Sequence, residues 1–224
     1  MAMISNLDLI LRVPLFAHLT AQQAEPLANA VTKKRYKRGE CMVEQGAHSD
    51  VLLIILTGRA RVLMTDKKGR EVILAILRSG DYMGDMCLID QEPNSASVHA
   101  EVLTDVLVLG RDEFLRALSE NASIALGVMR VLTKRLRYAD HKISSLALTG
   151  VYARVASVLL ETAVADGRGI LTIRDRVSRQ DVAKMVGASR EMVSRVMKDF
   201  EEKGFLQTLE GGSMMVNERR QSPR

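Results

Sequence analysis

The sequence predicts an α+β fold in which an N-terminal β-roll is followed by a long helix and a C-terminal winged helix-turn-helix. Three observations predict it. Between Tyr36 and Leu109 short apolar runs alternate with glycine turns at roughly 8–12-residue spacing, which is typical of a compact antiparallel barrel or roll. After Phe114 the apolar spacing becomes helical over a long stretch. Near the C-terminus, two short amphipathic helices are joined at Gly187.

The N-terminal half contains the expected strands. Residues 7–30 are expected to form two short helices, and the roll follows them. Strands are expected where short apolar runs lie between turn residues, at 51–56, 60–64, 72–77 and 102–109. The two cysteines, Cys41 and Cys87, are too few for a disulfide framework, and both are expected to be small core residues.

Length and composition describe a globular protein with room for more than one domain. The chain has 224 residues and a net charge of +5. We expect a β-roll effector domain at 1–118, a long dimerisation helix at 119–149 and a DNA-binding domain at 150–224. No apolar run approaches the ~20 residues that span a bilayer, and the first residues lack the pattern of a signal peptide. These features predict a cytoplasmic protein with no membrane partner.

The long helix carries a narrow apolar seam. Its members are separated by alternating steps of three and four residues: Met129, Leu132, Leu136, Ala139, Ile143 and Leu146. Such spacing is typical of the a and d positions of a two-stranded coiled coil. The alternative is a helix packed on its own barrel. We favour a homodimer formed through this seam.

The two helices near the C-terminus have clear start signals. Ser178 and Ser189 are good N-caps, Asp181 completes a capping-box-like start, and Gly187 supplies the turn. The second helix has one apolar stripe: Met192, Val193, Val196, Met197 and Phe200. A helix that buries this stripe presents its polar residues outward.

The outward stripe has the chemistry of base recognition. Arginine suits the acceptor edge of guanine, and glutamate suits the amino donor of cytosine. The candidate DNA-binding residues of the two helices are Arg179, Gln180, Ser189, Arg190, Glu191, Ser194, Arg195 and Lys198. The alternatives are an ordinary amphipathic helix pair with a solvated charged face and a helix pair that binds protein rather than double-stranded DNA.

Together these motifs resemble the cAMP receptor protein / fumarate-nitrate regulator (CRP/FNR) family across about residues 7–218. The resemblance is carried by the run from Gly187 to Arg195 and by the barrel turns at Gly39, Gly46, Gly58, Gly80-Asp81 and Gly84-Asp85. It implies an effector-binding β-roll like the cyclic nucleotide-binding domain, a homodimer, DNA recognition by residues 189–203 and RNA polymerase as a partner. It also implies that Arg190, Glu191 and Arg195 recognise a half-site like TGTGA.

The effector site departs from the cAMP-binding members of that family. The residues in the family's phosphate-binding positions are Gly84, Asp85, Met86, Asn94 and Ser95, and those in its adenine-binding positions are Ala139 and Asp140. Asn94 replaces an arginine, so it brings no charge and no bidentate contact. We therefore expect a small effector other than cAMP. The alternatives are a regulator without a ligand and one that responds to a cyclic nucleotide, either cAMP or cyclic di-GMP, with Asp140 accepting hydrogen bonds from guanine.

The sequence does not favour an iron-sulfur cluster, haem, a metal site or enzyme activity. Residues 1–40 contain no cysteine, so the iron-sulfur cluster of some family members is not expected. The four histidines are scattered at His18, His48, His99 and His141, which does not favour haem or a metal site. The sequence has no Ser-His-Asp order and no glycine phosphate loop, so we expect no enzyme activity and no catalytic residues.

Overall fold

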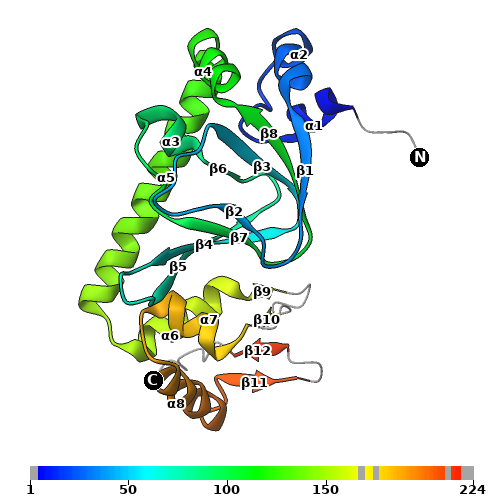
Figure 1. The fold of residues 1–224 in the computed structure, drawn as a ribbon. Helices are drawn as coiled ribbons and strands as arrows, with labels where there is room; N and C mark the ends of the chain where they lie inside the picture. Colours follow the sequence, from blue (N-terminus) through cyan, green and yellow to red (C-terminus); the bar gives the residue numbers. More distant parts are fainter. Residues whose placement is uncertain (1–4, 166–169, 174–176, 210–212, 218–224) are drawn as a thin grey trace. The chain divides into compact units, whose positions relative to one another are not determined.

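The computed structural model describes residues 5–165, 170–173, 177–209 and 213–217 (Figure 1). It confirms the α+β fold with a β-roll, a long helix and a winged helix-turn-helix. The chain divides into two compact units, Met1–Arg137 and Tyr138–Arg224. Helix α5 (Ala122–Leu148) passes from the first unit into the second.

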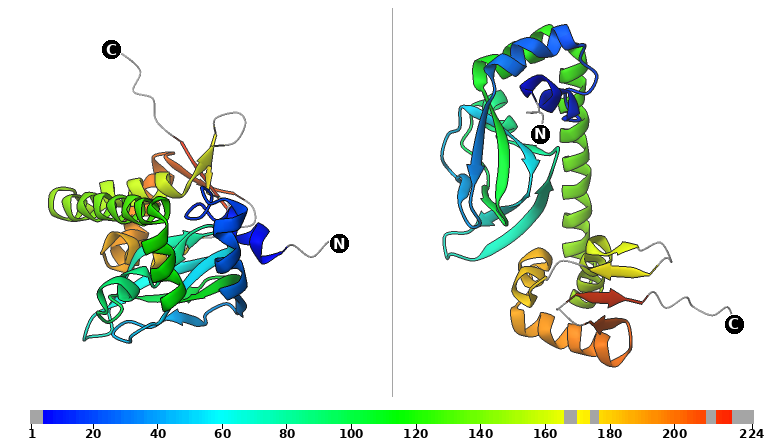
Figure 2. Two further views of the ribbon diagram at one scale, coloured as in Figure 1. Left: turned by 90° about the horizontal axis from the view of Figure 1, so that it is seen from above. Right: turned by 90° about the vertical axis from the view of Figure 1, so that its right-hand side faces the viewer.

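The first unit begins with helices α1 (Asn6–Arg12) and α2 (Ala21–Ala30), both with capping boxes. Two antiparallel four-stranded sheets then form the roll, in the orders β1-β8-β3-β6 and β2-β7-β4-β5. The strands are β1 (Thr32–Tyr36), β2 (Cys41–Val43), β3 (Val51–Thr57), β4 (Arg59–Thr65), β5 (Glu71–Arg78), β6 (Tyr82–Met83), β7 (Ser97–Ala100) and β8 (Thr104–Gly110). Helix α3 (Asp85–Asp90) follows β6, and α4 (Arg111–Glu120) precedes α5. Figure 2 shows the strands closing into a roll beside α5.

Strand β3 separates two apolar cores because its alternate side chains point to opposite faces. Leu52 and Ile54 belong to a cluster with Ile10, Phe16 and Phe114, which come from the helical layer. Its other face, with Leu53 and Ile55, packs against residues of both sheets inside the roll. The short apolar run at the start of this strand therefore marks burial on both faces.

Three expectations about this unit were wrong in detail. Residues 102 and 103 precede β8 and lie outside any strand, and both are exposed there. Cys41 is exposed on β2, although Cys87 is buried as expected. The helical stretch after Phe114 is broken at Asn121, whose backbone is extended between α4 and α5.

The second unit is built on helix α6 (Val151–Thr162), which follows the break at Thr149-Gly150. Its sheet has the order β11-β12-β10-β9, with β9 (Val164–Ala165), β10 (Leu171–Ile173), β11 (Leu206–Thr208) and β12 (Met214–Val216). The expected closing hairpin is formed by β11 and β12, which pair antiparallel; the glycines expected in its turn lie outside the described residues. Helices α7 (Arg179–Val186) and α8 (Arg190–Glu202) complete this unit around one apolar core.

Candidate DNA interface and effector pocket

Helix α7 starts and ends where its sequence predicts. The Ser178 hydroxyl oxygen accepts a hydrogen bond from the Asp181 backbone N–H at 3.0 Å, and the hydroxyl donates to the Asp181 carboxylate at 2.8 Å. Gly187 ends the helix with a φ of 62°, in the left-handed region that favours glycine. A β-carbon at Gly187 would lie 3.3 Å from Cδ2 of Leu146. The turn between the two helices is therefore held against the end of α5.

Helix α8 buries one face and exposes the other. Ser189 accepts a hydrogen bond from the Met192 backbone N–H at 3.2 Å and so caps the helix. Val193, Val196 and Met197 are buried in the core. Met192, which was expected in the same apolar stripe, is instead 37% exposed because it lies in the first turn, beyond the edge of the core.

The candidate DNA-binding side chains lie mostly on the surface of this helix pair. Arg179, Gln180, Ser189, Arg190, Glu191, Arg195 and Lys198 are exposed, and Ser194 is half-buried. Glu191, Arg195 and Lys198 share one side of α8 through their spacing of four and three residues. Lys198 also lies 3.7 Å from the Glu202 carboxylate, in an exposed ion pair that costs little to break.

Glu191 is held in its charged form. Hydrogen bonds from its own backbone N–H and from the Ser189 side chain, together with the nearby Arg190, lower the pKa of its carboxyl group. A carboxylate only accepts hydrogen bonds, which is the property that recognition of a cytosine amino group requires.

The candidate effector residues at the start of α3 include a buried carboxylate. Gly84 precedes α3 with a φ of 91°, and a β-carbon there would lie 2.5 Å from the Val51 carbonyl oxygen. Asp85 is 2% exposed and accepts two hydrogen bonds, each 2.9 Å, from Nη1 of Arg135. Nη2 of Arg135 donates to the Tyr82 carbonyl oxygen at 2.7 Å, and the guanidinium lies over the Tyr82 ring. The sequence analysis missed Arg135 and Tyr82, since no local motif marks an arginine so distant in the chain.

Asn94 has a different set of partners. Its side-chain nitrogen donates to the Ala47 carbonyl oxygen at 2.7 Å and to the Glu44 carbonyl oxygen at 3.3 Å. Both donors of the amide therefore hold the loop before β3. The segment from Gly84 to Ser95 contains three carboxylates and no lysine or arginine. The Asn94 side chain carries no charge and its amide nitrogen already donates to two carbonyl oxygens, so it does not supply the charge-assisted contact that an arginine makes to a phosphate.

The remaining effector candidates are exposed. Met86 and Ser95 are exposed in the first unit, whereas Ala139 and Asp140 are exposed on α5 in the second unit. The described residues contain no group of three or more histidine, cysteine, aspartate or glutamate residues placed to hold a metal ion. Nor does the described part of the chain include a helix long and apolar enough to cross a membrane.

Most side chains of the apolar seam on α5 are exposed, but one of them packs against the roll. Met129, Leu136, Ile143 and Leu146 are more than half exposed, and Ala139 is exposed as well. Leu132 is different, because it is half-buried and packs against the helical core of the roll. A large exposed apolar stripe on one helix is typical of a surface that binds another protein chain.

A capped helix pair with an exposed polar face and a β-wing defines a winged helix-turn-helix protein. The comparisons with known proteins agree. Residues 33–121 match the cyclic nucleotide-binding domain, and residues 153–221 match the Crp-like helix-turn-helix domain.

Curated relatives and solved structures extend the match along the chain. A CRP-like cAMP-activated global transcriptional regulator of Mycobacterium tuberculosis is 30% identical over 207 residues, which cover 88% of this chain and 91% of the relative. The cAMP-activated global transcriptional regulator Vfr of Pseudomonas aeruginosa is 31% identical over 192 residues, covering 82% and 88%. The structure of the c-di-GMP responsive global regulator CLP of Xanthomonas campestris has a TM-score of 0.76 at 24% identity, covering 88% of this chain and 99% of that chain.

The chain therefore belongs to the cAMP receptor protein / fumarate-nitrate regulator (CRP/FNR) family. It is a DNA-binding transcription regulator and not an enzyme.

Proposed function

We propose that this regulator acts as a homodimer that recognises a palindrome with TGTGA-like half-sites and is controlled by a small effector other than cAMP. The observation that carries the DNA part is the division of α8: Val193, Val196 and Met197 are buried, while Arg190, Glu191 and Arg195 are exposed. A two-fold dimer matches two half-sites about one helical turn apart. Contact with RNA polymerase is part of the same proposal and rests on the family alone.

The effector part rests on Asn94 and the charges near it. A charge-assisted contact to phosphate is absent from this position, because the Asn94 amide is bonded to the carbonyl oxygens of Glu44 and Ala47. The exposed Asp140 stands where an adenine-binding hydroxyl is found in the cAMP-binding members.

A second candidate is regulation by a cyclic nucleotide. The name of the M. tuberculosis relative describes that protein as cAMP-activated, and its match covers most of both chains. Asp140 favours cyclic di-GMP over cAMP within this alternative, since a carboxylate accepts two hydrogen bonds from the Watson–Crick edge of guanine. Calorimetric titration of the purified protein with each nucleotide separates the candidates. Tight binding of cAMP to the wild type would overturn our choice.

The DNA part is tested by fluorescence anisotropy with a palindromic duplex and with duplexes that carry one changed base pair in each half-site. We expect Arg190→Ala and Glu191→Ala each to lose about 1–3 kcal/mol of discrimination at one base pair. Lys203→Ala is the matched control, because Lys203 follows the same helix but pairs with Asp199. If both variants kept the wild-type preference at every base pair, the proposed recognition would be wrong.

A further inference from the structure

One methionine of helix α8 does not join the apolar core of the second unit. Met192 is 37% exposed, whereas Val193, Val196 and Met197 on the same helix are buried. Phe200 also packs against that core, and Met192 is not among the core residues that the structure describes. The other exposed side chains of α8 are all charged. A large apolar side chain therefore lies on a face of the helix that is otherwise ionic.

The cap of the helix fixes the position of Met192. Its backbone N–H donates to the Ser189 hydroxyl oxygen at 3.2 Å, and the Ser189 side chain also bonds to the Glu191 carboxylate. The N-terminal residues of a recognition helix are the ones that contact base edges in the major groove. Met192 is therefore held at the end of α8 that we expect to lie nearest to the bases.

Met192 lies at one side of the residues proposed to read the bases. At 3.6 residues per turn it is roughly 60° from Arg195 and roughly 100° from Glu191 around the helix axis. Arg190 is also roughly 100° from Glu191, in the opposite direction. Arg190 and Met192 thus flank the reading face on its two sides, and one flank is charged while the other is apolar.

The base edges in the major groove offer an apolar group that fits this flank, the 5-methyl group of thymine. The methyl group stands at the pyrimidine end of its base pair, beside the backbone of its own strand, so it faces the side of an inserted helix. In a TGTGA half-site each G·C pair has a thymine in both neighbouring base pairs. A residue next to Glu191 and one turn before Arg195 therefore meets a thymine beside the pairs that these two residues are proposed to read. The flexible thioether chain of methionine adapts well to such a contact.

We propose that Met192 is a further specificity-determining residue, which packs against the 5-methyl group of a thymine in each half-site. This inference rests on the proposed recognition of TGTGA-like half-sites. It adds an apolar contact to the polar contacts of Arg190, Glu191 and Arg195, and it extends recognition from the G·C pairs to an adjacent A·T pair.

Uracil in place of thymine tests the contact without any change to the protein, because the two bases differ only in the 5-methyl group. Fluorescence anisotropy measures the affinity of the full-length wild type for the palindrome and for duplexes with uracil at one thymine position of both half-sites, taken in turn. We expect one position at which uracil weakens binding about ten- to twentyfold, roughly fourfold for each methyl group lost from the contact.

Variants of Met192 assign that effect to its side chain. In Met192→Ala the same uracil duplex should bind less than about twofold more weakly than the thymine duplex, because the methyl group has lost its partner. Met192→Leu keeps an apolar side chain and should retain most of the response to uracil. Alanine is a good helix former at this exposed position, so we expect the thermal unfolding of the second unit to change little.

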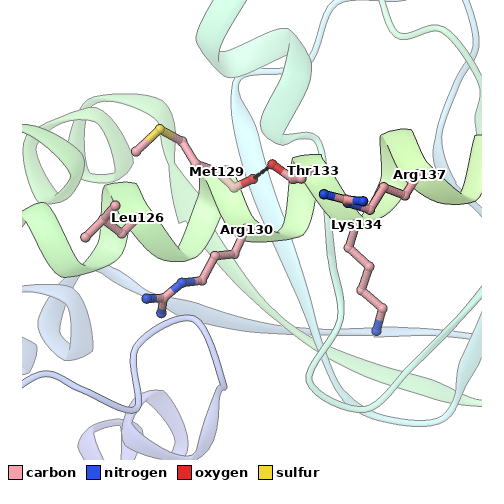
Figure 3. Close-up of a pocket in the computed structure, with 6 residues that line it drawn as sticks. All are labelled: Leu126, Met129, Arg130, Thr133, Lys134 and Arg137. Atoms are coloured by element: carbon pink, nitrogen blue, oxygen red, sulfur yellow. Dashed lines mark hydrogen bonds between the residues drawn. The ribbon is translucent and has the colours of Figure 1, made fainter.

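Met64→Ala is the matched control, because Met64 is 38% exposed on β4 of the first unit. It should show the wild-type response to uracil. Met129 is a less suitable control, since it borders a shallow groove on α5 together with Leu126 (Figure 3) and belongs to the proposed dimer seam. Its replacement would change dimerisation as well as the apolar surface.

The outcomes separate this inference from the proposed function. If the wild type prefers the palindrome to a shuffled duplex but binds every uracil duplex as tightly as the thymine duplex, only this inference fails. It also fails alone if uracil weakens the wild type and Met192→Ala equally, because another group then reads the methyl. A wild type with no preference for the palindrome would overturn the proposed half-site and this inference together.

Discussion

The ion pair between Arg135 and Asp85 gives the sharpest stability prediction, because its two members are buried to different extents. The Asp85 side chain is 2% exposed, whereas the Arg135 side chain is 37% exposed. Arg135→Ala removes both hydrogen bonds to the carboxylate and the bond to the Tyr82 carbonyl oxygen. It leaves a buried charge without a partner.

The expected cost follows from that geometry. Breaking a fully buried pair by removing one member costs about 3–5 kcal/mol, and the partial exposure of Arg135 lowers this to about 2–4 kcal/mol. Asp85→Asn leaves instead an arginine that can turn toward water, so we expect a loss of about 1 kcal/mol. At about 2–4 °C per kcal/mol, Arg135→Ala lowers the melting temperature of the first unit by roughly 5–15 °C.

Differential scanning calorimetry of the full chain measures the unfolding temperatures of both variants. The transition that shifts in these variants is assigned to the first unit, because Asp85 and Arg135 both lie there. Arg38→Ala, at an exposed position of the same unit, is the control and should stay within about 0.5 kcal/mol of the wild type. Equal losses for Arg135→Ala and Asp85→Asn would refute the reasoning, because the asymmetry comes only from the burial of the carboxylate.

Three further predictions concern the seam, the effector pocket and the turn. Leu136→Asp places a charge in the exposed seam and should give monomers with much weaker operator binding; a sedimentation profile that stays dimeric would point to another interface. Asn94→Arg should raise the affinity for cAMP roughly tenfold in calorimetric titration, and only partly restore tight binding because the amide bonds to the loop are lost too; an unchanged affinity would contradict this. Gly187→Ala should destabilise the second unit by roughly 1–2 kcal/mol in thermal unfolding, because alanine is strained at the left-handed φ of 62° and its β-carbon would lie 3.3 Å from Cδ2 of Leu146. An unchanged unfolding temperature would show that the turn relaxes freely.

The sequence by itself determined the elements whose signals are local. Ser178 and Gly187 fixed the two ends of α7 and Ser189 fixed the start of α8, because capping and left-handed backbone depend on neighbouring residues only. The alternation of short apolar runs and glycine turns predicted the roll for the same reason. The order of these elements along the chain pointed to the family, and the comparisons confirm the family.

Only the tertiary structure decided which side chains meet across long distances in the chain. The pairing of Arg135 with Asp85 and the use of the Asn94 amide by the loop before β3 depend on how strands and helices pack, and no local pattern records that. The same holds for Leu132, whose spacing fits the seam but whose side chain packs on the roll. Periodicity identifies the apolar positions of a helix, whereas the neighbours present in space decide which of them remain exposed to bind a second chain.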